Sequence, residues 1–163
     1  MIEAYAIRKA KEADLGEILR IYAAAREFMA SRGNPNQWGK TNPPKQRLLQ
    51  DIAAGDLYVM VRDGILHGVF AFILGDDPTY GEIYEGSWLS DRPYGTIHRI
   101  AGIGSGGIFS ACVGYCGGIC AHLRVDTHEN NLPMQRAIER EGFTRCGTIY
   151  IADGSPRIAY ERV

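Results

Sequence analysis

The sequence predicts a mixed α/β fold organised around a mostly antiparallel sheet. Two apolar runs, 57–62 and 65–74, flank Asp63-Gly64, a dipeptide that supplies the positive φ values of a type I′ turn, so we expect an antiparallel hairpin. Helical periodicity before this hairpin, and a strand, helix, strand, helix, hairpin order near the C-terminus, complete the pattern. At about 100–200 residues per domain, the 163 residues are expected to form a single domain, 1–163.

The first hundred residues combine short strands with two helices. Apolar residues recur at helical spacing from Leu15 to Met29, and Pro44 is suited to the first turn of a second helix that ends near Gly55. A Pro/Gly/Asn-rich insert, 33–44, joins these helices. The strands expected in this half, besides the hairpin, are 4–8, 79–84 and 95–102.

The C-terminal half is expected to alternate helices and strands. Apolar spacing predicts a helix within 103–120, although Gly114, Gly117 and Gly118 each cost about 1 kcal/mol in a helix interior; we expect them to allow close packing on the sheet. A strand at 123–127 precedes a helix that either Asn130 or Asn131 could cap and that Gly142 ends. Segments 143–151 and 157–163 then form a closing hairpin around the turn at 153–156.

Composition and charge narrow the possible classes of function. Hydrophobic residues make up 45% and charged residues 23%, which is typical of a folded soluble chain. Eighteen Lys and Arg balance nineteen Asp and Glu, so the net charge of −1 predicts no general attraction to nucleic acid or to anionic membranes. The longest apolar run, near 69–74, is far shorter than the ~18 residues of a membrane span. The N-terminus also lacks a signal-peptide pattern, so we expect a cytoplasmic protein.

The four cysteines predict neither a disulfide nor a metal site. Cys112, Cys116, Cys120 and Cys146 form no CxxC pair, and the first three are spaced to share one helix face. We therefore expect reduced thiols packed as small apolar residues, and no bound metal.

A glycine-rich loop, 102–107, lies between a predicted strand and a predicted helix. Glycines there let backbone N–H groups converge on an anion at a helix N-terminus, and the absence of Lys and Ser/Thr after the last glycine excludes a GxxxxGK[ST] P-loop. The loop also fits GxGxxG, with Asp126 placed as a ribose-binding acid, but too few βαβ units follow for a dinucleotide fold. A third interpretation is a turn without a ligand. We favour phosphate binding.

These features together resemble the acetyl-CoA-dependent N-acetyltransferase (GNAT) superfamily. The resemblance rests on LRVDTHENNLPMQRAIEREGFTRCGTIYIADGSPRIAYER (123–162), on IHRIAGIGSGG (97–107) and on NPNQWG followed by PP. It implies the acyl-CoA N-acyltransferase fold, in which the sheet splays between the parallel strands 96–101 and 123–127 and carries helices on both faces. It also implies acetyl-CoA as the co-substrate, entering that gap, and acetyl transfer to a primary amine.

The resemblance assigns cofactor contacts to positions of this chain. Backbone groups of Ile100 and Ala101 would hold the pantetheine arm, and Asn130 and Met134 would flank it. The positions expected to bind the diphosphate are Gly104, Ser105, Gly106, Gly107 and Ile108. The chain departs from the family at Ile138, because that position commonly holds a tyrosine that protonates the departing thiolate.

Candidates for proton transfer remain open at this stage. Among possible bases we rank Glu85 first, followed by Glu82 and by His98 on the strand that would bear the cofactor. Tyr150 could donate a proton to the thiolate, and backbone N–H groups at the end of strand 96–101 could polarise the acetyl oxygen.

The acceptor is expected to be an amine on a small molecule or a peptide. Trp38 in the insert, together with Tyr84 and Trp88 around Glu85, could line its pocket. A homodimer is possible. The alternative functions are a non-catalytic acyl-CoA sensor and, with less support, a dinucleotide-binding oxidoreductase.

Overall fold

Seven strands form one sheet in a computed structural model that describes residues 4–103 and 106–163. The strand order is β1-β2-β3-β4-β5-β7-β6, and every neighbouring pair is antiparallel except β4 and β5. The strands are β1 (Ala6–Lys9), β2 (Leu57–Arg62), β3 (Ile65–Leu74), β4 (Gly95–Gly102), β5 (Leu123–Thr127), β6 (Thr144–Tyr150) and β7 (Pro156–Arg162). This is the mostly antiparallel sheet with one parallel pair that the sequence predicts.

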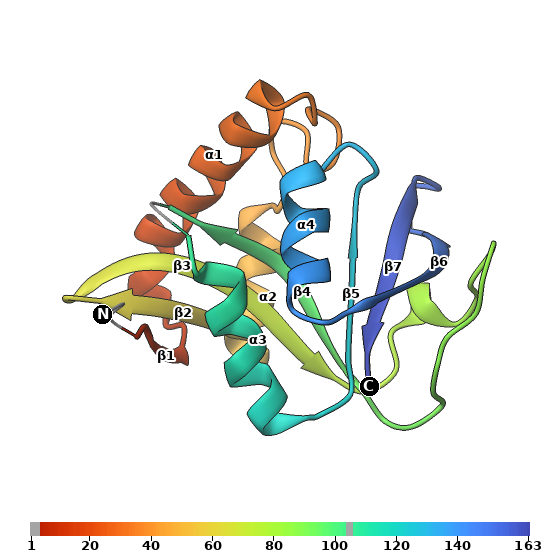
Figure 1. The fold of residues 1–163 in the computed structure, drawn as a ribbon. Coiled ribbons are helices and arrows are strands. Elements are labelled where there is room, and N and C mark those ends of the chain that lie inside the picture. Colours follow the sequence, from red (N-terminus) through yellow and green to blue (C-terminus); the bar gives the residue numbers. More distant parts are fainter. Residues whose placement is uncertain (1–3, 104–105) are drawn as a thin grey trace.

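Helices cover both faces of the sheet (Figure 1). Apolar residues of α1 (Leu15–Ser31) and α2 (Lys45–Ala54) pack with β2 and β3 in one core. Those of α3 (Ile108–Ile119) and α4 (Leu132–Arg140) pack on the opposite face in a second core. Single-turn 3₁₀ helices occupy Glu12–Asp14 (η1) and Pro78–Tyr80 (η2). None of the helices in the described part of the chain is long and apolar enough to cross a membrane.

The hairpin of β2 and β3 has the predicted boundaries and turn. Asp63 and Gly64 have φ values of 53° and 74°, which is the left-handed pair that a type I′ turn requires. Residues 4–8 were expected to form the first strand, and β1 starts slightly later.

The glycines of α3 do not serve the close packing that we expected of them. A Cβ atom at Gly114, Gly117 or Gly118 would have no neighbour within 4 Å, because these positions face away from the sheet. Close approach occurs instead at Gly68 and Gly102, where an added Cβ would lie 3.0 and 2.6 Å from the side chain of Ile108. The sheet therefore contributes the glycines, and the helix contributes the bulky residue.

The strand predicted at 79–84 is absent. The segment begins with η2 and makes only an isolated bridge between Tyr84 and Thr148 of β6. Glu85 then has a φ of 58°, and Gly86 is so close to the chain that an added Cβ would lie 1.8 Å from the carbonyl oxygen of Cys146. A left-handed residue cannot continue a strand, so the alternating pattern of 79–84 ends in a loop against the sheet edge.

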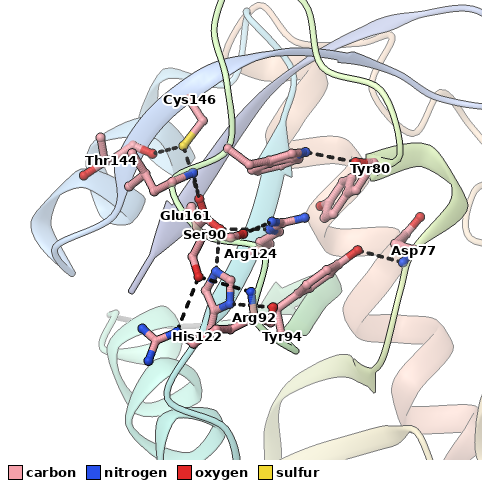
Figure 2. Close-up of polar contacts among 12 residues, drawn as sticks. Asp77, Tyr80, Ser90, Arg92, Tyr94, His122, Arg124, Thr144, Cys146 and Glu161 are labelled. Atoms are coloured by element: carbon pink, nitrogen blue, oxygen red, sulfur yellow. Dashed lines mark hydrogen bonds and ion pairs between the residues drawn. The ribbon is translucent and has the colours of Figure 1, made fainter.

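A buried carboxylate anchors this loop to the sheet, as Figure 2 shows. Glu161 of β7 is fully buried and accepts hydrogen bonds from the backbone N–H of Leu89 (2.6 Å), from Arg124 Nε (3.1 Å) and from His122. The guanidinium of Arg124 stacks on Trp88, 3.9 Å from the ring centroid, and donates to the Ser90 carbonyl. Burial alone would raise the pKa of Glu161, but these hydrogen bonds outweigh it and lower that pKa.

Candidate active site

β4 and β5 are hydrogen-bonded to each other only near the start of each strand. Their register pairs Gly95 with Leu123 and Thr96 with Arg124, and no further pair follows in these two fully described strands. A cavity of about 600 Å³ is lined by residues 97–100 of β4 and 125–127 of β5. The predicted splay between the two parallel strands is therefore confirmed.

A β-bulge shapes the β4 wall of the cavity. His98 pairs with Ala71 and Ala101 with Val69, so Arg99 and Ile100 together stand opposite one residue of β3. Arg99 has a φ of 51°, which is costly for a residue with a side chain. The cost is offset by two contacts. Tyr22 Oη donates to the Arg99 carbonyl (2.6 Å), and Arg99 Nη2 forms an ion pair with Asp51 Oδ2 (2.8 Å).

An Asp–His pair lies on the same wall. His98 Nε2 is 2.7 Å from Asp77 Oδ2, and the other carboxylate oxygen of Asp77 accepts from the backbone N–H (2.9 Å) and the hydroxyl (2.7 Å) of Thr79. Burial alone would raise the pKa of Asp77, but hydrogen bonds from His98 and Thr79 outweigh it and lower the pKa to about 2. Asp77 is therefore ionised near neutral pH and fixes the orientation of the imidazole.

A second carboxyl group comes from β5. Asp126 Oδ2 accepts a 2.6 Å hydrogen bond from the hydroxyl of Tyr80, a side chain only 2% exposed. Burial raises the pKa of Asp126, although His98, Tyr80 and Arg157 each act in the opposite direction. Tyr80 is thus a hydrogen-bond partner of the acid that the GxGxxG interpretation assigned to a ribose.

The loop that carries Asp77 and Tyr80 is held from both ends. Tyr94 accepts a hydrogen bond from the backbone N–H of Asp77 (2.8 Å), as Figure 2 shows. The indole of Trp88 donates to the Tyr80 carbonyl (2.9 Å). Both aromatic residues also sandwich the Arg124 guanidinium. The buried cluster around Glu161 therefore fixes two polar groups next to the cavity.

The insert between α1 and α2 forms the opposite wall. Gln37 Oε1 accepts from Asn131 Nδ2 (3.0 Å), and the Gln37 carbonyl accepts from Arg157 Nη2 (3.2 Å). Trp38 lines the cavity and meets Tyr22 edge-on at 5.5 Å. The insert is thus tied to the start of α4 and to β7, on the far side of the gap from β4.

Comparison with solved structures decides the family. An acetyltransferase of the GNAT family from Streptococcus agalactiae is 32% identical to this chain, covers 100% of it and 97% of its own length, and superposes with a TM-score of 0.90. This chain belongs to the GNAT family of acetyltransferases. No family model matches the sequence, and no curated protein does.

More distant members of the GNAT family share the fold. A Listeria monocytogenes GNAT acetyltransferase is 18% identical over 99% of this chain and 98% of its own, with a TM-score of 0.73. A phosphinothricin acetyltransferase from Sinorhizobium meliloti, solved in complex with AcCoA, is 14% identical over 98% of this chain and 88% of its own, with a TM-score of 0.66.

The cofactor positions expected for this acetyltransferase follow the gap and the start of α3. Ile100 and Met134 line the cavity, and Ala101 is buried next to Ile100 in β4. Gly106, Gly107 and Ile108 lead into α3, and Gly107 is its N-cap, with a φ of 80° and no side-chain cap. Gly104 and Ser105 lie outside the described residues. Of the two possible caps of α4, Asn131 is the one used, since its side chain accepts from the Met134 N–H (3.2 Å), and Asn131 rather than Asn130 lines the cavity.

The other expected site residues of this acetyltransferase lie in the main cavity, in a second pocket or outside both. His98 and Trp38 line the main cavity. Glu82, Tyr84 and Tyr150 line a second pocket, which shares Pro78 and Thr79 of η2 with the main cavity. The remaining two expected residues belong to neither pocket: Glu85 accepts a hydrogen bond from the Thr148 hydroxyl (3.2 Å), and Trp88 packs on Tyr80. In the described ranges, no cluster of three or more His, Cys, Asp or Glu side chains could hold a metal ion.

Sequence reasoning missed several groups of the cavity wall. Asp77 is not among the site residues expected from the sequence, although an Asp two residues before Thr in Asp-Pro-Thr is suited to cap a short helix, as it does in η2. No local sequence pattern indicates Arg157 or Gln37 as cavity residues. Arg157 reaches the cavity because of the order of the strands, and Gln37 because of the course of the insert.

Proposed function

We propose that this protein transfers the acetyl group of acetyl-CoA to a primary amine by direct attack within a ternary complex. The observation that supports this most is the cavity in the β4–β5 gap, which carries an ordered imidazole–carboxylate pair on its wall. Membership of the GNAT family supports acetyl transfer in general.

The residues of the gap are suited to the long arm of coenzyme A. Beyond Thr96, β4 has no strand partner on the β5 side, so its backbone groups there are free to bind a ligand. Ile100 and Met134 add apolar surface. The first turn of α3 has no side-chain cap, so its N–H groups and the helix dipole suit the diphosphate. Bound acetyl-CoA would supply the activated acetyl thioester.

His98 is the group we propose to accept the proton of the attacking amine. When Nε2 of the neutral ring donates to ionised Asp77, Nδ1 is the nitrogen that can accept a proton. Asp77 orients the ring and stabilises the imidazolium that forms. Glu82 and Glu85 line no part of the cavity, which is why we prefer His98.

The bulge in β4 is the part of the chain we propose to polarise the acetyl carbonyl. A bulge leaves backbone groups outside the regular ladder, and N–H groups held in a fixed geometry stabilise a developing oxyanion. Tyr22 and Asp51 hold the bulge through Arg99, so this geometry is set before substrates bind.

Thermal shift and thiol release together test the proposal. Acetyl-CoA should raise the Tm by several degrees and NAD(H) should not, since only ligands that bind the folded state stabilise it. Gly106→Asp should abolish the shift by charge repulsion, whereas the neutral Gly106→Asn should keep most of it. An acetyl-CoA shift without thiol release for any amine would indicate a sensor, and equal shifts with NAD(H) would contradict the assignment.

A further inference from the structure

The wall of the cavity away from β4 carries two arginines that the proposed chemistry does not use. Arg157 at the start of β7 and Arg47 in the first turn of α2 both line the cavity. Two acids also line the cavity: Asp77 lies in the loop after β3, and Asp126 belongs to β5. Asp77 and His98 therefore lie on the β4 side of the cavity and Arg157 and Arg47 on the insert side, while Asp126 lies close enough to Arg157 for their charges to interact.

Arg157 is buried without a carboxylate bonded to it. The residue is 5% exposed, and its guanidinium donates only to the carbonyls of Pro156 (2.9 Å) and Gln37 (3.2 Å). None of the ion pairs found among the described residues includes Arg157, and the nearby acid Asp126 uses Oδ2 to accept from Tyr80. A buried cation costs stability unless an anion compensates it, so this arrangement suits an anionic ligand.

The start of α2 also carries more positive charge than is usual at the N-terminus of a helix. Its first turn contains Lys45 and Arg47 and no acidic residue, although cations are unfavourable at the positive end of a helix. Its N-cap is Pro44, which offers no side-chain cap to the first N–H groups. Arg47 is exposed and makes no hydrogen bond or ion pair with any described residue. Its guanidinium lies on the cavity wall, as Asn42 and Pro43 beside it also do.

We infer that the acetyl acceptor is a small amine that also carries a carboxylate, of the α-amino acid type. The carboxylate binds Arg157 and Arg47, because a guanidinium binds a carboxylate through two parallel hydrogen bonds. The amine then faces His98 and Asp77 on the β4 wall. This inference deepens the proposed function and rests on it.

The size and the apolar lining of the cavity agree with such a molecule. The volume of about 600 Å³ has to accept the end of the thioester arm together with the acceptor, so little room remains for a large one. Met29, Trp38 and Ile151 provide apolar contacts beside the arginines. A compact amino acid with an apolar side chain satisfies both conditions.

The test compares free amino acids with their carboxamides. Initial rates of thiol release are measured with acetyl-CoA and a panel of L-amino acids, and each active one is paired with its carboxamide. We expect kcat/KM for the acid to exceed that for the carboxamide at least tenfold. Intrinsic reactivity works against this result, because the negative carboxylate raises the pKa of the amine and leaves less of it neutral. A preference for the acid would therefore come from binding.

Variants assign the preference to the arginines. Arg47→Gln removes a charge that makes no internal contact, so folding is not at risk, and it should reduce the acid-to-carboxamide ratio of kcat/KM at least tenfold through a raised KM for the acid. Arg157→Lys, which keeps the charge but loses the planar fork, should reduce the ratio as well. Arg20→Gln, an exposed arginine of α1 paired with Glu17, is the matched control and should leave the ratio unchanged.

The outcomes separate this inference from the proposed function. Equal or better turnover of carboxamides, or activity only with spermidine, 2-phenylethylamine or a lysine peptide, would overturn the amino acid assignment while acetyl transfer stands. No thiol release with any amine would overturn the proposed function itself. As a second measurement, with coenzyme A present, the active amino acid should raise the Tm and its carboxamide should not.

Discussion

The hydroxyl of Tyr22 donates a 2.6 Å hydrogen bond to the carbonyl oxygen of Arg99, 77 residues further along the chain. This bond joins α1 to the bulge of β4 at the wall of the active-site cavity. Burial raises the pKa of Tyr22, so the hydroxyl stays a donor throughout the accessible pH range. The same ring contacts Trp38 of the insert, so one residue touches both walls of the cavity.

Tyr22→Phe should therefore weaken both stability and activity. Losing the donor leaves a part-buried carbonyl without its partner, which costs about 1 kcal/mol, and we expect kcat/KM to fall about tenfold as the bulge loosens. Urea unfolding and steady-state rates measure the two effects. Tyr160→Phe is the matched control: Tyr160 is equally buried, and its hydroxyl has no hydrogen-bond partner in the described part of the chain. Equal behaviour of the two variants would contradict a special role for Tyr22.

The assignment of His98 as the base predicts a change in the pH profile. His98→Gln should lower kcat about 10²–10⁴-fold and remove the acidic limb of log kcat against pH, because the group whose deprotonation produces that limb is gone. Measurements from pH 5 to 9 with a saturating amine test this. A normal profile for His98→Gln, together with a collapse of activity in Glu85→Gln or Glu82→Gln, would instead identify the base that we ranked higher from the sequence alone.

Asp77 predicts a specific loss of stability in acid. Its pKa of about 2 in the folded protein lies below the usual 3.8, so its contribution is complete above about pH 4 and is lost as the pH falls toward 2. The shift corresponds to about 2 kcal/mol. In urea titrations, the difference in free energy of unfolding between the wild type and Asp77→Asn should shrink by about 1.5 kcal/mol between pH 6 and pH 2.5, because part of the folded-state carboxylate is still ionised at pH 2.5. A difference independent of pH would contradict this electrostatic interpretation.

The glycines of α3 offer a way to stabilise the protein. Gly114→Ala and Gly118→Ala should each add about 0.5–1 kcal/mol, because alanine loses less backbone entropy in a helix and the added methyl group meets open space. Gly102→Ala is the contrasting variant, since its Cβ would lie 2.6 Å from Ile108, and it should destabilise the protein. Thermal unfolding of the three variants tests both the expected stabilisation and the expected destabilisation. A lower Tm for Gly114→Ala would contradict the finding that this position has open space around it.

Local chemistry made the secondary structure largely predictable. The Asp63-Gly64 turn, the strand 95–102 and the Asn cap of α4 each depend on neighbours within a few residues, and the structure has all three. The strand expected at 79–84 failed for a reason that is not local. Glu85 and Gly86 adapt their backbone to β6, a strand formed more than fifty residues later.

The sequence by itself determined the order of elements, the glycine-rich entry into α3 and the resemblance to an acetyltransferase, because spacing and turn chemistry act over short stretches of chain. Only the tertiary structure decided which polar groups share the cavity. Asp77 meets His98 across 21 residues, Tyr80 meets Asp126 across 46, and Arg157 meets Gln37 across 120. Such meetings depend on strand order and on the splay of β4 from β5, and no local pattern of residues encodes either.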